Sequence, residues 1–255
     1  MNAQVTRLQT AAIKGTRLRS PEQVTLGRSG AAGDRRFFLV DDRGRMLNSK
    51  VLGMLHTVSA GYDESSGRLS LEFDDGRVLD DVVGDGGDVE TTAYGEFRMG
   101  QLVDGPWAEA LSTLCDRQLR LVRTESAVDR GTKGAVSLVS RGSLQRLAEQ
   151  AQADSVDARR FRMLIEVDSL EPHAEDDWVG REARVGESLL RFEGHVGRCL
   201  VTHRDPETGE MTLPTLDLLR AYRDDVASTE PLAFGIYGRV LQGGTVRVGD
   251  GVELA

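Results

Sequence analysis

Short apolar runs separated by glycine-rich turns make up most of this chain of 255 residues. Between positions 67 and 79, Ser-Leu-Glu-Phe alternates polar and apolar side chains, and the Asp-Asp-Gly that follows is a hairpin signal. Residues 35–42 and 47–51 are typical of two further strands joined by an Asp-Arg-Gly-Arg turn. Other strands are expected over 118–124, 137–140, 160–168, 183–194, 195–205 and 234–254.

Three segments change to the 3.6-residue period of a helix. Residues 106–115 place apolar side chains from Trp107 onward on one side, after a proline that suits a first helical turn. Residues 137–148 begin as a strand and become helical, with Ser140 in the N-cap position. Residues 212–225 form an amphipathic helical pattern that ends in charged residues. We therefore expect few helices, spread along the chain.

Strands outnumber helices, and no regular alternation of strand and helix appears. This balance predicts an α+β, strand-dominated fold around a curved sheet or barrel. The composition shifts near residues 100–105, the expected subdomain boundary, so the chain divides into residues 1–102 and 103–255. The acidic, glycine-rich residues 80–90 are expected to form a solvated loop.

The charge balance restricts the classes of partner. A net charge of -9 argues against general nucleic-acid binding, which needs a basic face to neutralise phosphates. A basic pocket inside the acidic shell is still open to Arg35, Arg36, Arg198 and Arg204. No run approaches the roughly 18–20 apolar residues of a membrane helix, and the first residues lack the apolar core of a signal peptide. We expect a cytoplasmic protein without a membrane partner.

Two cysteines, Cys115 and Cys199, are too few for a disulfide framework, and both are expected to be thiols. Cys115 ends a helical segment and is expected to pack as a small apolar residue. Cys199 is either a buried structural cysteine or a thiolate, favoured by neighbouring Arg198, that binds a soft metal or a sulfane sulfur. His195 and His203 each lie four residues away, so a continuous strand would place them on the same face as Cys199, where they could move protons.

The arginines allow two interpretations. Strand alternation is expected to point either Arg35 or Arg36 inward, and a buried guanidinium needs an anionic partner. A phosphate fits the guanidinium fork. The same reasoning applies to Arg162, whose partner could instead be Asp34 or Glu166, which would make Arg162 structural.

Three motifs carry a family resemblance. They are Ala12-Ile13-Lys14-Gly15, Arg160-Phe161-Arg162-Met163-Leu164, and Cys199 followed by Thr-x-x-Asp-Pro-x-Thr-Gly over 202–209, in which Asp-Pro predicts a tight turn. In this order, the chain resembles the MOSC superfamily, named from the C-terminal domain of molybdenum-cofactor sulfurase. It is most similar to the amidoxime-reducing members, which carry an N-terminal β-barrel part, and the resemblance covers nearly the whole chain.

The resemblance implies a MOSC-type β-barrel core with a few peripheral helices, an N-terminal β-barrel part over 1–102 and a MOSC domain over 103–255. It implies that Cys199 matches the family cysteine that ligates molybdenum in amidoxime-reducing members and is thought to carry sulfur in others. It also implies a molybdenum–pterin cofactor held by basic and polar side chains. The matching positions are Lys14, Arg36, Arg162, Arg198, Thr202 and Asp205.

Two positions depart from the family pattern. Gly15 stands where the family commonly has a serine, so a hydroxyl is absent. Leu164 stands where the family commonly has an asparagine, so an amide that would contact the cofactor is replaced by an apolar side chain. These departures put the usual cofactor contacts in question.

Two functions remain open from the sequence. The first is a molybdenum-dependent reductase of N-hydroxylated small molecules, with Cys199 on the metal and electrons from a separate protein, since the chain has no flavin motif and no iron–sulfur cysteine set. The second is a molybdenum-free MOSC scaffold that binds another small ligand or uses Cys199 as a sulfur carrier or nucleophile.

Overall fold

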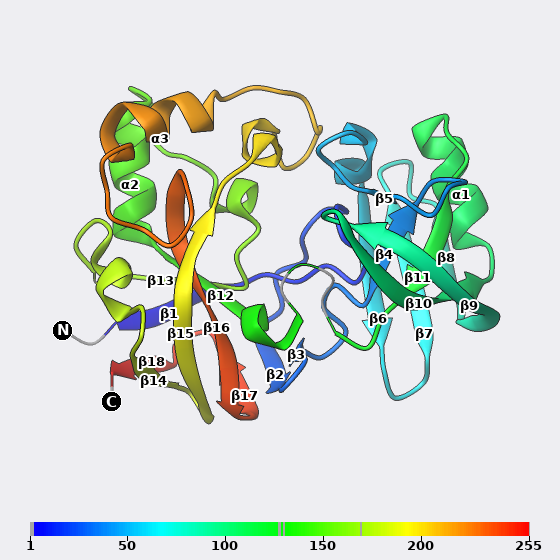
Figure 1. Cartoon of the computed structure of the whole chain (residues 1–255), viewed down its shortest axis with the longest axis horizontal. Coiled ribbons are helices and arrows are strands. Elements are labelled where there is room, and N and C mark those ends of the chain that lie inside the picture. The colour runs from blue at the N-terminus through cyan, green and yellow to red at the C-terminus, as the bar shows by residue number, and fades with distance from the viewer. Residues whose placement is uncertain (1–2, 127–128, 130, 169, 255) are drawn as a thin grey trace.

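A closed barrel of seven strands forms one half of the protein (Figure 1). The structure is a computed structural model that describes residues 3–126, 129, 131–168 and 170–254. It confirms the strand-dominated α+β fold with a barrel core. The barrel strands, in spatial order, are β1 (Ala3–Leu8), β13 (Ile165–Val167), β12 (Val136–Ser140), β16 (Ala233–Gln242), β15 (Ser188–Gly197), β14 (Glu182–Val185) and β18 (Gly251–Leu254).

Alternating apolar side chains fill the barrel. Leu138, Ile165, Phe192 and Ile236, each from a different strand, are fully buried in one cluster. A three-stranded sheet in the order β17 (Gly244–Arg247), β2 (Gln23–Gly27) and β3 (Gly30–Ala31) adds Val24 to the same cluster. The N-terminal strands β1, β2 and β3 thus share a core with strands from the C-terminal half of the chain.

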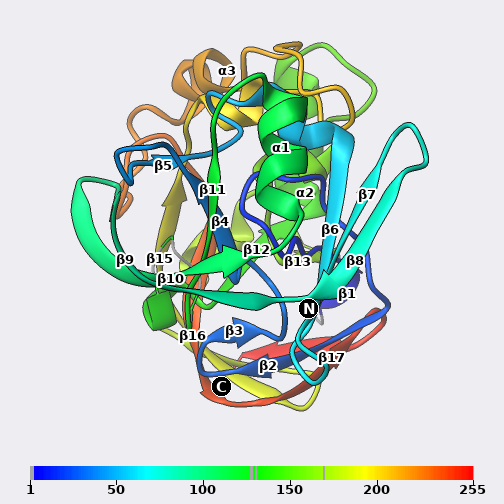
Figure 2. The same ribbon diagram turned by 90° about the vertical axis from the view of Figure 1, so that its right-hand side faces the viewer.

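The other half packs two sheets and a helix around a second core (Figure 2). One sheet has the order β5 (Met46–Leu47), β4 (Phe37–Val40), β11 (Arg120–Arg123), β10 (Glu96–Asp104) and β9 (Gly84–Ala93), and the other has β6 (Val58–Asp63), β7 (Arg68–Phe73) and β8 (Val78–Val82). Helix α1 (Trp107–Cys115) inserts Trp107, whose indole N–H donates to the carbonyl oxygen of Leu69 at 3.0 Å. Because α1 and β11 pack against strands that precede residue 103, both sides of the expected boundary contribute to this half. The division at 102/103 stays a prediction.

The three expected helices are confirmed. Helix α1 lies within 106–115, α2 spans Arg141–Gln150, and α3 spans Thr215–Arg223. The Ser140 hydroxyl accepts a hydrogen bond from the backbone N–H of Ser143 at 3.1 Å, as an N-cap does. No helix among the described residues is long and apolar enough to cross a membrane.

Four expected elements are wrong. The strand expected over 47–51 is a turn, because β5 ends at Leu47. The expected strand over 160–168 is a 3-10 helix at Ala158–Phe161 followed by the short β13. The expected strand over 195–205 stops at Gly197, and a 3-10 helix follows at Leu200–His203. Residues 80–90 form strands rather than a loop, because β9 completes its backbone hydrogen bonds with β10 although most of its side chains before Thr91 are exposed.

Candidate functional site

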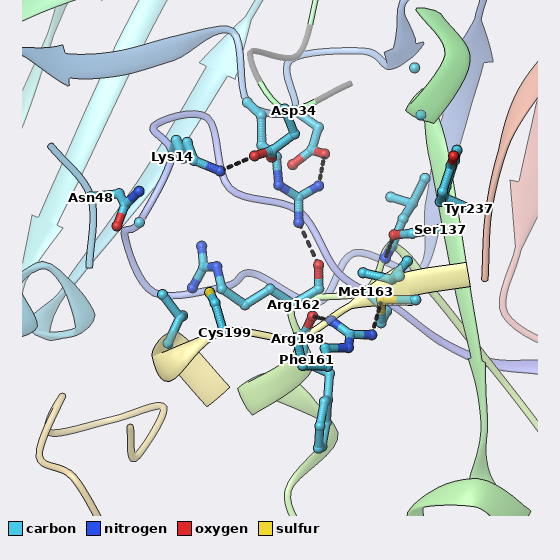
Figure 3. Close-up of a pocket in the computed structure, with 18 of the residues that line it drawn as sticks. Lys14, Asp34, Asn48, Ser137, Phe161, Arg162, Met163, Arg198, Cys199 and Tyr237 are labelled. Atoms are coloured by element: carbon cyan, nitrogen blue, oxygen red, sulfur yellow. Dashed lines mark hydrogen bonds and ion pairs between the residues drawn. The ribbon is translucent and has the colours of Figure 1, made fainter. Parts of the chain in front are cut away.

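A cavity of about 640 Å³ lies where the two halves meet, and the Cys199 side chain projects into it (Figure 3). Its lining combines side chains from both ends of the chain. Among the residues that the structure describes, the lining has six basic side chains and three carboxylates: Lys14, Arg35, Lys50, Arg160, Arg162 and Arg198 against Asp34, Asp129 and Glu230. A protein with a net charge of -9 therefore concentrates positive charge in this cavity.

The Cys199 loop is fixed by backbone contacts on both sides. Before it, the backbone N–H of Gly197 donates to the carboxylate of Glu230 at 3.0 Å, where β15 ends. After it, the carbonyl oxygen of Cys199 accepts hydrogen bonds from the backbone N–H and the hydroxyl of Thr202, at 3.1 and 3.0 Å. These contacts leave the Cys199 side chain exposed, so the interpretation as a buried structural cysteine is wrong.

The turn after Cys199 is tied to the other half of the protein. The Asp205 carboxylate accepts from the backbone N–H groups of Glu207 and Thr208, at 2.9 and 3.0 Å, and lies outside the cavity lining. The Arg204 guanidinium donates to the carbonyl oxygens of Gly209 and Lys50, at 2.5 and 3.0 Å. Asp205 therefore shapes the turn, and Arg204 holds that turn against the segment that follows β5.

Arg162 brings a positive charge into the cavity without a carboxylate of its own. It ends the 3-10 helix in the left-handed conformation, with φ of 55°, and its side chain enters the cavity (Figure 3). The guanidinium donates to the carbonyl oxygen of Thr16 at 2.7 Å, and no described carboxylate lies within ion-pair distance of it. Burial, reinforced by the charge of Arg35, lowers the pKa of Arg162 to about 10.

Arg35, rather than Arg36, is the member of the pair that lines the cavity. Arg35 adopts a left-handed backbone conformation with φ of 50°, and its guanidinium donates to the carbonyl oxygen of Arg162 at 2.6 Å. Arg36 points elsewhere, because its guanidinium donates to Glu64 at 2.8 Å and to the carbonyl oxygen of Thr124 at 3.0 Å. The structure thus does not bring Arg36 to the other expected site residues.

Lys14 reaches the cavity from the opposite side to Cys199 (Figure 3). Burial lowers the pKa of the Lys14 ammonium group, although the neighbouring Asp129 carboxylate acts against that change. Lys14 Nζ contacts Asp129 Oδ1, and the Tyr94 hydroxyl donates to the same oxygen. Lys14, Tyr94 and Asp129 come from three distant segments, so only the tertiary fold assembles this group.

Arg198 lines the cavity but does not serve Cys199 as expected. Its guanidinium donates to the carbonyl oxygens of Phe161 and Phe234, each at 2.9 Å, and to the sulfur of Met163 at 3.0 Å. Figure 3 shows the guanidinium directed toward Met163 rather than toward the Cys199 side chain. Arg198 therefore supports the loop that carries Arg162.

The histidines on either side of Cys199 are separated from it. His195 is buried in β15, where its Nδ1 accepts from the backbone N–H of Thr229 at 3.2 Å. His203 Nε2 accepts from the backbone N–H of Leu216 at 3.1 Å. Neither lines the cavity, so the expectation of a shared strand face with Cys199 is wrong, because the strand ends at Gly197.

The two departures from the family pattern have structural reasons. Gly15 has φ of 100°, and an added Cβ would lie 3.0 Å from the backbone nitrogen of Ser49, so a side chain is disfavoured there. Leu164 is buried in the barrel core, and its backbone N–H donates to the Ser137 hydroxyl at 3.0 Å. The cavity gains polar groups elsewhere, from Asn48, Ser49 and Tyr237, none of which carries a motif that would reveal it in the sequence.

The arrangement suits a ligand with two different ends. Lys14, Arg35 and Arg162 form a cationic wall that matches an oxyanion such as a phosphate. The exposed Cys199 sulfur is a soft ligand for a metal or a nucleophile. A molecule that carries both an oxyanion and a soft metal would engage both ends of the cavity.

Comparisons with known proteins agree with this organisation. The MOSC domain family matches residues 125–253, and the MOSC N-terminal beta barrel domain matches residues 2–87. The mitochondrial amidoxime-reducing component 1 of Xenopus laevis is 32% identical over 140 residues, which cover 52% of this chain and 40% of that protein. The human protein of the same name is 32% identical over 123 residues, 46% of this chain and 36% of that protein.

These matches span about two fifths of the length of the curated relatives. Among solved structures, the YuaD protein from Bacillus subtilis aligns with a TM-score of 0.47 and 13% identity, covering 100% of this chain and 96% of that one. The family matches together extend over most of the sequence. The chain therefore belongs to the MOSC domain family.

Proposed function

We propose that this chain binds a molybdenum–pterin cofactor in the cavity beside Cys199 and reduces N-hydroxylated small molecules there. The observation that carries the proposal is the Arg162 guanidinium, which lies inside the cavity with no described carboxylate as an ion-pair partner. Asp34 and Asp129 offset this charge only in part and do not pair with it directly, and a desolvated charge without a paired counter-ion is costly, so such a group is expected where a ligand supplies the negative charge. The relatives named for amidoxime reduction indicate the class of reaction.

The residues present fit such a cofactor. The cationic wall of Lys14, Arg35 and Arg162 offers donors to an oxyanion, and Cys199 offers a thiolate to a high-valent metal. A cavity of about 640 Å³ falls within the range of small-molecule and cofactor sites. Since Gly15 and Leu164 offer neither hydroxyl nor amide, the cationic side chains would carry most of the recognition.

When bound, the cofactor would supply a two-electron redox couple. Reduction of an amidoxime to an amidine breaks the N–O bond, consumes two electrons and two protons, and releases water. The protein would orient the cofactor through Arg162 and Cys199 and would hold the Cys199 loop through Glu230 and Thr202. An electron-transfer protein is the expected donor, because the sequence contains no flavin motif and only two cysteines.

The test is reduction of a simple aromatic amidoxime by protein purified from a host that makes the cofactor, with a reduced viologen as the electron source. We expect the wild type to form the amidine, and Cys199→Ser and Arg162→Met to lose that activity. Cys115→Ser is the matched control, because Cys115 packs on α1 far from the cavity lining, and it should retain activity. A wild type that carries the cofactor but forms no amidine would contradict the reductase assignment.

A second candidate is a molybdenum-free sulfur carrier. The specific observation in its favour is the apolar pair Met163 and Leu164 in the cavity lining, beside an exposed Cys199 thiol. Such a carrier would show a mass increase of about 32 Da for a persulfide on Cys199. An unmodified intact mass from cells grown with ample sulfur would reject this candidate.

A further inference from the structure

The cationic wall of the cavity has two carboxylates beside it, Asp34 and Asp129. The three cations repel one another. Burial lowers the pKa of Lys14 most, and the charges of Arg35 and Arg162 lower it further. The wall therefore needs negative charge in the ligand-free protein. The two carboxylates provide it in different ways.

Asp34 is part of the fold. Its side chain is 7% exposed, and it accepts a hydrogen bond from the backbone N–H of Ala11 at 2.8 Å. It also pairs with Arg35 at 2.5 Å, in the turn that leads into β4. Removing the Asp34 carboxylate from this place would break the backbone connection, so Asp34 stays when a ligand binds.

The described partners of Asp129 are two side chains. Its own side chain is 29% exposed, and its carboxylate contacts Lys14 Nζ and the Tyr94 hydroxyl. Among the described residues, no backbone N–H donates to this carboxylate. Asp129 lies in the connection between β11 and β12 rather than in a sheet, so it can leave Lys14 without breaking a strand pairing.

We propose that the Asp129 carboxylate is an internal counter-ion of Lys14. It occupies the position on Lys14 that the anionic group of a ligand would take, so an incoming oxyanion must displace it. An oxyanion brings at least as much negative charge and more acceptor oxygens, and it can satisfy Lys14 and the nearby guanidinium groups together. Asp129 thus sets the affinity of the cavity, because only the fraction of molecules with Asp129 displaced is competent to bind.

The inference rests on the proposed function only in treating the cavity as a seat for an anionic ligand. Inorganic phosphate is the probe, so the outcome does not depend on molybdenum content. Binding is measured by isothermal titration calorimetry at low ionic strength on the full chain. The variants are Asp129→Asn, which removes the competing charge, and Asp225→Asn, an exposed aspartate that controls for the change in net charge.

We expect Asp129→Asn to bind phosphate on the order of tenfold more tightly than Asp225→Asn, as removal of an internal competitor predicts. In a Lys14→Met background the same substitution should bring a clearly smaller gain, because the contested ammonium group is gone and only the longer-range effect of Asp129 on Arg35 and Arg162 remains. Tyr94→Phe, which removes one anchor of the carboxylate, should give a smaller gain of the same sign.

Equal or weaker phosphate binding by Asp129→Asn relative to Asp225→Asn overturns the proposal. A gain of undiminished size in the Lys14→Met background overturns it as well, since it would place the competition elsewhere. If Asp129→Asn does not fold, Tyr94→Phe decides: a tighter phosphate site supports the displacement, and an unchanged one rejects it.

Discussion

Replacing Arg162 with methionine should leave the ligand-free protein as stable as the wild type or more stable, although the side chain is largely enclosed. Methionine keeps the unbranched stem of arginine and removes the charge. Most substitutions of buried side chains destabilise by about 1 kcal/mol or more, so the sign of this effect is diagnostic. The sign distinguishes a charge that serves ligand binding from a charge that stabilises the fold.

The magnitude follows from the surroundings of the guanidinium. Burial lowers its pKa from the ordinary value of an arginine to about 10, which corresponds to about 3 kcal/mol of unfavourable free energy in the charged folded protein. The hydrogen bond to the carbonyl oxygen of Thr16, at 2.7 Å, returns about 1.5–3 kcal/mol when the donor is charged. The difference predicts a gain of about 1 kcal/mol or no change for Arg162→Met.

The pH range of the measurement follows from the sign of the pKa change. Below pH 10 the guanidinium is protonated in both the folded and the unfolded protein, so the cost is present in full at neutral pH. The cost would be relieved only as the pH rises through about 10, where the folded protein releases the proton first. Urea denaturation at pH 7 therefore measures the whole effect.

The control is Arg28→Met, at an exposed position in a turn, which should change the free energy of unfolding by less than about 0.5 kcal/mol. If Arg162→Met lost about 2 kcal/mol or more while Arg28→Met stayed neutral, the guanidinium would be a structural element. The reasoning that its charge awaits a ligand would then fail.

Three further outcomes follow from local geometry. Gly33→Ala should lower the free energy of unfolding by about 2 kcal/mol or more in urea denaturation, because its φ is 72° and the added Cβ would lie 2.4 Å from a carbonyl oxygen of β6. Gly76→Ala, with φ of 82° and open space around it, should lower the free energy of unfolding by only about 1 kcal/mol. Equal losses for the two substitutions would contradict the steric clash expected at Gly33. At pH 8 a thiol reagent should modify one cysteine per folded chain, the exposed Cys199, because burial raises the pKa of Cys115 to about 11. Rapid modification of both cysteines would contradict the burial of Cys115. Burial lowers the pKa of His56 to about 4, so the free energy of unfolding should fall as the pH drops from 6.5 toward 4. His56→Gln should flatten that part of the curve of unfolding free energy against pH, and an unchanged slope would refute the role of His56.

The strand-dominated fold was predictable because strand and helix periods are local. The alternation around residues 67–79 and the helical spacing over 106–115 each reflect one buried face, and both elements lie where that pattern places them. The broken strand at Gly197 was not predictable, because Glu230, far along the chain, accepts the hydrogen bond from its backbone N–H. That break separates Cys199 from His195.

The candidate site was predictable only in part. Lys14, Arg162 and Cys199 do meet in one cavity, together with Arg198 and Thr202. One arginine of the Arg35–Arg36 pair does line the cavity, but neither lies in a strand, because β4 begins at Phe37; the left-handed backbone at Arg35, not strand alternation, directs that side chain inward. Asn48, Ser49 and Asp129 carry no motif, and they join the cavity only through the packing of the two halves.

Molybdenum content tests the central claim most directly. The claim is that the paired anion that Arg162 lacks among the described residues and the soft partner of Cys199 belong to one cofactor in this cavity. Inductively coupled plasma mass spectrometry should find close to stoichiometric molybdenum in the wild type and in Cys115→Ser, purified from a host with full cofactor biosynthesis. Arg162→Met and Cys199→Ser should lose most of it. Trace molybdenum in the wild type, or full occupancy that survives both substitutions, would contradict the account.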